Sequence, residues 1–248
     1  FIYDNNGQTT GPRLLTTTEF YERLVQEVRK AIRTRHEGSF DLDLQLRPYG
    51  SAGSLAVSLA AFHRYFAPDG PAWSYERQAL IKLRPISGEA ALGDEVQTLR
   101  DAFVYGGEPF DVPAMRAMRE RQLRHLVKGG TVNAKFSAGG LVDVEYLVQT
   151  LQMRHAARLP AARDPNTLAA LGALMEGGVL GAEEGAALRE AYVFLRRLID
   201  ALRMVRGNAQ DLTVPPEGAE EWMYLARRMG LDPPAAAAAA AEDVRRDL

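Results

Sequence analysis

Five charged side chains in the first third of the sequence are of the kinds that bind metal ions and phosphate groups. The acidic members are Asp41 and Asp43, and the basic members are Arg47, Lys82 and Arg84. Carboxylate oxygens are preferred ligands of Mg²⁺, whereas guanidinium and ammonium groups bind phosphate oxygens. If the two segments that carry them share a sheet, the set suits a magnesium-bound nucleoside triphosphate. Phosphoryl and nucleotidyl transfer depend mostly on such positioning and charge neutralisation.

Both segments alternate apolar with polar residues, which is the pattern of a half-buried strand. In "FDLDLQLRP" (40–48) the apolar residues would face one side and the polar ones the other, and "QALIKLRP" (78–85) repeats the pattern. Each segment ends in Leu-Arg-Pro, so we expect the arginine at a strand terminus, because proline ends the ladder. On spacing alone, the favoured interpretation is a solvent-facing sheet surface with cross-strand ion pairs, and the transfer site is the alternative.

A second cluster lies in "NAKFSAGGLVDVEYLVQTLQ" (133–152), where two glycines precede an expected helix. Lys135 comes before the turn, and Asp143 and Glu145 lie in the first turns of the helix. Acidic residues at that place discourage phosphate binding and favour a metal ion, a cationic partner or compensation of the helix dipole. By composition, an ordinary glycine-rich helix start is the favoured interpretation.

The elements that would position these residues change in type along the chain. The first 105 residues mix strand-like segments, including "FIYD" (1–4), with helices expected at 17–35 and 55–66, and Thr16 with Glu19 forms a capping-box pattern before the first helix. Beyond residue 105 only helical patterns remain, at 113–127, 141–155, 167–175, 183–205 and 220–228. We therefore expect an α+β fold, with a mixed sheet and helices in residues 1–105 and an all-helical bundle in residues 106–248.

The composition limits the chemistry and the partners. The 248 residues include no cysteine, which excludes disulfides, thiolate nucleophiles and cysteine-bound zinc, and the four histidines lack metal-binding spacing. A formal net charge of −2 argues against extensive binding to nucleic acids or membrane surfaces. No apolar run reaches the roughly 18 residues of a membrane span, and no signal peptide opens the chain, so a cytoplasmic location is expected.

Four blocks of the sequence resemble, in order, the glutamine synthetase adenylyltransferase family, the bifunctional adenylyltransferase and adenylyl-removing enzymes of bacterial nitrogen control. The blocks are "DLDLQLRPYGSAGSL", "AFHRYFAPDGPAWSYERQALIKLRPISG", "NAKFSAGGLVDVEYLVQTLQ" and "AYVFLRRLIDALRM". The resemblance extends over residues 40 to 205, and four blocks in family order are far more specific than any one of them. It implies an incomplete nucleotidyltransferase domain of the DNA polymerase β type, followed by a helical domain.

The resemblance also implies roles for individual residues. Asp43 matches the third metal-binding carboxylate of the family, so it would hold Mg²⁺ or act as the base for the acceptor hydroxyl. Gln45 stands where the family usually has an arginine, and no role is carried over to Asp41. The residues implied to contact the triphosphate or phosphate are Arg47, Lys82, Arg84 and Lys135, and those on the domain-interface side of the cleft are Asp143 and Glu145.

The activity that the resemblance implies is transfer of AMP from ATP to a tyrosine of glutamine synthetase, or removal of that AMP by phosphorolysis, in nitrogen regulation. Glutamine synthetase and the PII signalling protein are the implied partners. The first segment, "FIYDNNG", resembles the sequence just after the family's Asp-x-Asp pair, so we expect this chain alone to be inactive. Two alternatives stay open. One is a PII-type uridylyltransferase, and the other is an inert helical interaction module whose charged strands are structural.

Overall fold

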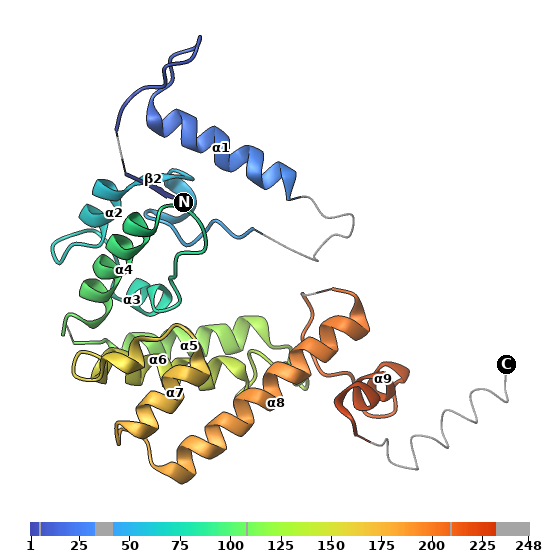
Figure 1. The fold of residues 1–248 in the computed structure, drawn as a ribbon. Helices are drawn as coiled ribbons and strands as arrows, with labels where there is room; N and C mark the ends of the chain where they lie inside the picture. Colours follow the sequence, from blue (N-terminus) through green and yellow to red (C-terminus); the bar gives the residue numbers. More distant parts are fainter. Residues whose placement is uncertain (5, 33–41, 108, 209, 232–248) are drawn as a thin grey trace, which may run out of the picture. The chain divides into compact units, whose positions relative to one another are not determined.

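The structure of the chain is a computed structural model that describes residues 1–4, 6–32, 42–107, 109–208 and 210–231. Helices predominate in these ranges, and two short strands form a small parallel sheet (Figure 1). This content is compatible with the expected α+β class, while the nucleotidyltransferase sheet itself stays a prediction. None of the helices in the described ranges combines the length and the apolar character that crossing a membrane requires.

The strands are β1 (Ile2–Tyr3) and β2 (Val57–Ser58), and Ile2 lies opposite Val57 in their pairing. The α-helices are α1 (Thr17–Ala31), α2 (Leu59–Tyr65), α3 (Ser74–Leu80), α4 (Ala90–Tyr105), α5 (Val112–Leu126), α6 (Leu141–His155), α7 (Thr167–Glu176), α8 (Ala182–Arg206) and α9 (Glu220–Met229). Two short 3₁₀ turns are η1 (Gly50–Ala52) and η2 (Pro160–Arg163).

The chain divides into two compact units, which we call unit 1 and unit 2. Unit 1 contains Phe1–Val112 and Val148–Val179, and unit 2 contains Pro113–Leu147 and Leu180–Leu248. The helix α6 is shared between them, because the boundary at residues 147 and 148 falls inside it. The predicted division into 1–105 and 106–248 does not follow these units and stays a prediction about domains.

The predicted capping box at the start of α1 is confirmed. The Thr16 hydroxyl accepts a hydrogen bond from the Glu19 amide at 3.2 Å, and the Glu19 carboxylate accepts one from the Thr16 amide at 2.8 Å. Both bonds satisfy amide groups that have no partner inside the helix. The helix was expected to reach residue 35 and ends at Ala31, and residues 33–35 lie outside the described residues.

The predicted strand at 40–47 is wrong over its described part, because residues 42–47 belong to no strand. Asp43 Oδ1 accepts a hydrogen bond from the Gln45 amide at 2.9 Å, and the Gln45 carbonyl accepts one from the Arg47 amide at 2.9 Å. Aspartate competes with strand pairing in this way, by bonding to the backbone two residues further on. Phe40 and Asp41 lie outside the described residues.

The second predicted strand, at 78–84, is also wrong. Its first residues form the end of α3, and a turn and irregular backbone follow. The Glu76 carboxylate accepts a hydrogen bond from the Trp73 amide at 3.2 Å, at the start of the helix. Arg77, Gln78 and Ile81 are buried, which is the helical spacing i, i+1, i+4 rather than alternation. A segment of seven residues is too short to distinguish the two-residue period of a strand from the 3.6-residue period of a helix. The burial of Gln78, which the strand pattern placed on the polar face, agrees with the helix.

Each unit has its own apolar core. In unit 1, β1 and α1 meet around Tyr3, whose ring stacks on that of Tyr21 with centroids 4.8 Å apart. A second cluster of unit 1 joins α2 to α4 through Phe62, Phe66 and Val96. In unit 2, α8 packs against α9 in a cluster of buried residues that comprises Ala134, Leu141, Ile199, Ala201, Leu202, Leu212, Leu225 and Met229.

Candidate functional site

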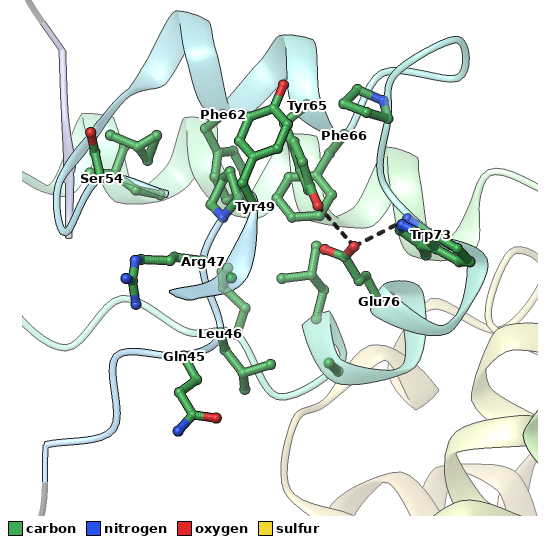
Figure 2. Close-up of a pocket in the computed structure, with 18 of the residues that line it drawn as sticks. Gln45, Leu46, Arg47, Tyr49, Ser54, Phe62, Tyr65, Phe66, Trp73 and Glu76 are labelled. Carbon is green, nitrogen blue, oxygen red and sulfur yellow. Dashed lines mark hydrogen bonds between the residues drawn. The ribbon is translucent and has the colours of Figure 1, made fainter. Parts of the chain in front are cut away.

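A hollow of about 650 Å³ opens in unit 1 beside the segment 45–50 (Figure 2). Its lining comes from β1 and the residue before it, from the segment 45–57, from α2, and from the stretch 71–83 that contains α3. This volume falls within the roughly 300–1,000 Å³ that is typical of small-molecule sites. We call this feature the unit 1 hollow.

Aromatic rings make up much of one wall of the unit 1 hollow. Phe62, Tyr65 and Phe66 follow one another at helical spacing on α2 and its end, so they lie on one face. The rings of Phe62 and Phe66 lie 4.7 Å apart between centroids, and those of Tyr65 and Phe66 lie 4.8 Å apart at a near-perpendicular angle. Tyr49 reaches the same wall, edge-to-face with Tyr65 at 4.7 Å. These are the offset and edge-on arrangements that aromatic pairs prefer.

A carboxylate lies beside this wall. Glu76 Oε1 accepts hydrogen bonds from the Tyr65 hydroxyl at 2.9 Å and from the Trp73 amide at 3.2 Å (Figure 2). Burial, together with the hydrogen bond to Glu76, raises the pKa of Tyr65, so its hydroxyl stays protonated and continues to donate. Glu76 therefore has one oxygen engaged by the protein, at the edge of a space lined by aromatic rings.

The turn 48–53 forms a lip of the hollow, and Arg47 braces it. The Arg47 side chain donates from Nε to the Gly53 carbonyl at 3.0 Å, from Nη2 to the Ser51 carbonyl at 3.2 Å, and from Nη1 to the Leu44 carbonyl. These bonds use three of the five N–H groups of a guanidinium. Arg47 thus lines the hollow while most of its donors hold the loop, and its role in phosphate binding stays a prediction.

Asp43 is exposed and does not line the unit 1 hollow, although Gln45, two residues further on, does. Within the described ranges, Asp43 is in no ion pair, and its contact is the hydrogen bond from the Gln45 amide. The same ranges contain no group of three or more His, Cys, Asp or Glu side chains that could hold a metal ion. The structure therefore places Asp43 near the lip but builds no metal centre around it.

The other two predicted phosphate contacts of unit 1 lie away from the hollow lining. The Lys82 ammonium donates to the Pro165 carbonyl at 2.8 Å and to the Thr167 hydroxyl at 2.7 Å, so it ties the end of α3 to the start of α7. Arg84 is exposed. Of the four described candidates in unit 1, Arg47 alone lines the hollow. Among the described residues, no contact joins Asp43 to Arg47, Lys82 or Arg84, so the structure does not show the predicted cluster.

In unit 2, the predicted interface residue Asp143 is bound to an arginine that the sequence pattern did not single out. Arg119 Nε donates to Asp143 Oδ1 at 2.6 Å, and Nη2 donates to Oδ2 at 3.1 Å. The Lys135 ammonium lies over the Phe136 ring, 5.0 Å from its centroid, and Glu145 is half-buried. Arg119 lies 24 residues before Asp143, and no local spacing signals a pair at that separation.

The two glycines before α6 serve the turn itself. Gly139 has a φ of +75°, and its amide donates to Asp143 Oδ2 at 2.8 Å. A Cβ at Gly140 would lie 2.9 Å from the carbonyl oxygens of Lys135 and Ser137, so only glycine fits without a shift. This geometry agrees with the favoured interpretation of the segment as a glycine-rich helix start.

Comparison with known families gives two matches along the chain. Residues 1–99 match the family model described as glutamate-ammonia ligase adenylyltransferase, and residues 114–248 match the one described as GlnD PII-uridylyltransferase. These matches fall on either side of residues 100–113.

Curated relatives carry the name bifunctional glutamine synthetase adenylyltransferase/adenylyl-removing enzyme. The protein of Stenotrophomonas maltophilia (strain K279a) is 39% identical over 234 residues, which is 89% of this chain and 24% of the relative. That of Hahella chejuensis is 35% identical over 89% of this chain and 23% of the relative. That of Pseudomonas putida (strain KT2440) is 34% identical over 93% of this chain and 24% of the relative. The chain therefore spans about a quarter of the length of these relatives.

Proposed function

Because this chain belongs to the glutamine synthetase adenylyltransferase family, we propose that it serves the transfer of AMP from ATP to glutamine synthetase, or the removal of that AMP. The observation that carries the proposal is the 39% identity over 234 residues to a relative named as both adenylyltransferase and adenylyl-removing enzyme. A tyrosine acceptor, phosphorolysis as the route of removal, and action in the cytoplasm are parts of the same proposal.

In this proposal, Arg47 is the phosphate-binding residue with the most support. It lines the unit 1 hollow, and two of its five N–H groups are not used by the carbonyls that brace the turn. A guanidinium held rigidly by backbone carbonyls is pre-organised for phosphate oxygens, because little further ordering is needed when it binds. Lys82, Arg84 and Lys135 stay predicted contacts.

The described residues do not by themselves make up the magnesium site that the family resemblance implies. Asp43 is the one predicted ligand among them, and no cluster of three or more suitable side chains surrounds it. We therefore assign no step of the transfer to a metal ion held by these residues. Asp43 stays a proposed carboxylate of the reaction, and the hydrogen bond that it accepts from the Gln45 amide is to Oδ1.

The test is a transfer assay on the full-length product of the gene and on this chain alone. Each protein is incubated with glutamine synthetase and ATP labelled on the α-phosphate, and label on the acceptor is measured. We expect Asp43→Asn to lower transfer about 100-fold or more, as loss of a general base does. Asp69→Asn, at an exposed aspartate of unit 1, is the matched control. Equal transfer by the parent and Asp43→Asn would contradict the role of Asp43.

A second candidate function is uridylyl transfer to a PII-type protein. It is favoured by the match of residues 114–248 to the family model described as GlnD PII-uridylyltransferase. The same assay distinguishes the two functions when UTP labelled on the α-phosphate and a PII protein are supplied in parallel. Label from ATP on glutamine synthetase supports the first proposal, and label from UTP on the PII protein supports the second.

A further inference from the structure

Four aromatic side chains that line the unit 1 hollow are exposed, namely Phe1, Tyr49, Trp73 and Tyr75, and phosphate binding does not need them. Tyr49 is 64% exposed and Trp73 is 65% exposed, although both line the hollow. Figure 2 shows Trp73 next to Glu76, and Arg47 with Gln45 on the other side of the view. Large exposed rings around a concave site are typical of surfaces that stack a planar ligand.

The backbone of Tyr49 is held in an unfavourable conformation at the lip of the hollow. Its φ of 63° and ψ of 15° are in the left-handed region, and it is the one non-glycine residue with positive φ among those described. This conformation is unfavourable for a residue with a side chain, and strain of this kind concentrates at ligand sites. The neighbouring Gly50 shares the left-handed conformation without that penalty.

Glu76 adds a polar group with capacity left for a ligand. Its Oε1 accepts from the Tyr65 hydroxyl and the Trp73 amide, whereas Oε2 accepts no hydrogen bond from the described residues. A carboxylate oxygen accepts from an exocyclic amino group of a base and is repelled by a carbonyl at the same place. The hollow therefore offers stacking surfaces beside an acceptor that favours an amino group over a carbonyl at that place on the base.

We propose that the unit 1 hollow binds the adenine ring of the nucleotide, with Tyr49 and Trp73 as stacking surfaces and Glu76 Oε2 as acceptor for the exocyclic amino group. This inference rests on the proposed function for the identity of the nucleotide, and it adds the place of the base and the residues that select it. The position of Arg47 on the same lining puts a cation within the site for the phosphates.

The direct test uses the intrinsic fluorescence of Trp73. The chain has two tryptophans, Trp73 in unit 1 and Trp222 in unit 2, so Trp222→Phe leaves Trp73 as the single reporter. Adenosine is titrated into this variant, with tripolyphosphate and N-acetyltyrosinamide as parallel probes. We expect adenosine to quench the emission in a saturable way, because a stacked base contacts the indole. Tripolyphosphate should leave the emission unchanged.

Substitutions at the lip and at the carboxylate then test the assigned roles. Tyr49→Gly keeps the left-handed backbone and removes the ring, so adenosine should bind about tenfold more weakly without loss of fold, and Tyr49→Phe should bind as the parent does. Inosine, which has a carbonyl in place of the amino group and no other exocyclic amino group, should bind about tenfold more weakly than adenosine. Glu76→Gln should narrow this difference, because an amide can donate to the carbonyl. Phe194→Ala, at an exposed ring of unit 2, is the control.

Two results would overturn the inference. One is that adenosine does not quench the Trp73 emission, or quenches it equally in the Tyr49→Gly variant and in the parent. The other is stronger quenching by N-acetyltyrosinamide than by adenosine, which would assign the hollow to a tyrosine side chain. The transfer assay separates this inference from the proposed function. If adenosine binding depends on Tyr49 but no AMP is transferred, the inference holds and the proposed function is wrong. If AMP is transferred but adenosine binds equally well without the Tyr49 ring, the proposed function holds and the inference is wrong.

Discussion

Arg119 and Asp143 form a two-pronged ion pair within unit 2, in which both carboxylate oxygens accept from one guanidinium at 2.6 and 3.1 Å. The Arg119 side chain is 13% exposed and that of Asp143 is 38% exposed. Asp143 also accepts from the Gly139 amide, and Arg119 donates to the Ser137 carbonyl at 3.0 Å. The ion pair thereby connects α5 to the turn that starts α6. These hydrogen-bond partners of the Asp143 carboxylate all belong to unit 2.

Replacement of Asp143 by asparagine should lower the free energy of unfolding by about 2 kcal/mol. The reason is that the mostly buried Arg119 would lose a charged acceptor and keep its desolvation cost. Urea unfolding of the parent and the variant measures the change. The control is Asp200→Asn, because Asp200 pairs with Arg203 at 3.5 Å on the surface and should contribute less than about 0.5 kcal/mol. An equal loss in both variants would contradict the structural role.

Gly53 closes the lip of the unit 1 hollow, and no larger residue fits there. A Cβ at this position would lie 1.9 Å from the Pro48 carbonyl oxygen, so the turn must open in Gly53→Ala. We expect a loss of more than about 2 kcal/mol in the free energy of unfolding, together with weaker adenosine binding. Gly11→Ala is the matched control, since nothing lies within 4 Å of a Cβ there. Thermal unfolding of both variants checks the prediction, and equal melting temperatures would refute it.

Most of the helical part of the fold is predictable from the sequence, because helices are specified locally. The predicted 141–155 coincides with α6, and the helices predicted at 167–175, 183–205 and 220–228 match α7, α8 and α9 within two residues at each end. No helix is predicted at 90–105, where the structure has α4. Its residues Leu92, Val96, Leu99 and Phe103 recur at helical spacing and pack in the core, so the signal is present in the sequence.

The lining of the unit 1 hollow and the side-chain contacts elsewhere in unit 1 are much less predictable, because they join residues far apart in the chain. Lys82 binds groups 83 and 85 residues away, and Gln78 donates to the buried Gln149, 71 residues away, at 2.7 Å. No spacing rule reports such pairs, and two short windows that alternate by chance predict strands where the chain turns or forms a helix. The aromatic wall of the hollow is likewise not signalled by local spacing, because Tyr49 and Trp73 come from segments outside α2 and join its rings only in the folded chain.

Lys82 provides a test between the predicted role and the observed one. As an anchor to Pro165 and Thr167, it should stabilise unit 1, so Lys82→Met should lower the free energy of unfolding by about 1 to 2 kcal/mol. As a phosphate contact, it should instead change the affinity for tripolyphosphate. Urea unfolding and calorimetric titration of tripolyphosphate measure the two effects on one variant. Lys30→Met, which breaks an exposed ion pair with Glu27 in α1, controls for loss of a positive charge. Unchanged stability with reduced affinity would reject the anchor.

Tyr105 should make the stability of unit 1 depend on pH at the alkaline end. Burial raises the pKa of Tyr105 from 10.0 to about 12, because the phenolate would lose its hydration. The folded state therefore keeps its proton while the unfolded state loses it, so the stabilisation is complete below pH 10 and is lost as the pH rises towards 12. Tyr105→Phe has no proton to lose there. The difference in unfolding free energy between Tyr105→Phe and the parent should be constant from pH 7 to 9 and shift in favour of the variant above pH 10. Urea unfolding at several pH values measures it, and a difference that stays constant up to pH 11.5 would show that the Tyr105 hydroxyl is solvated in the folded protein.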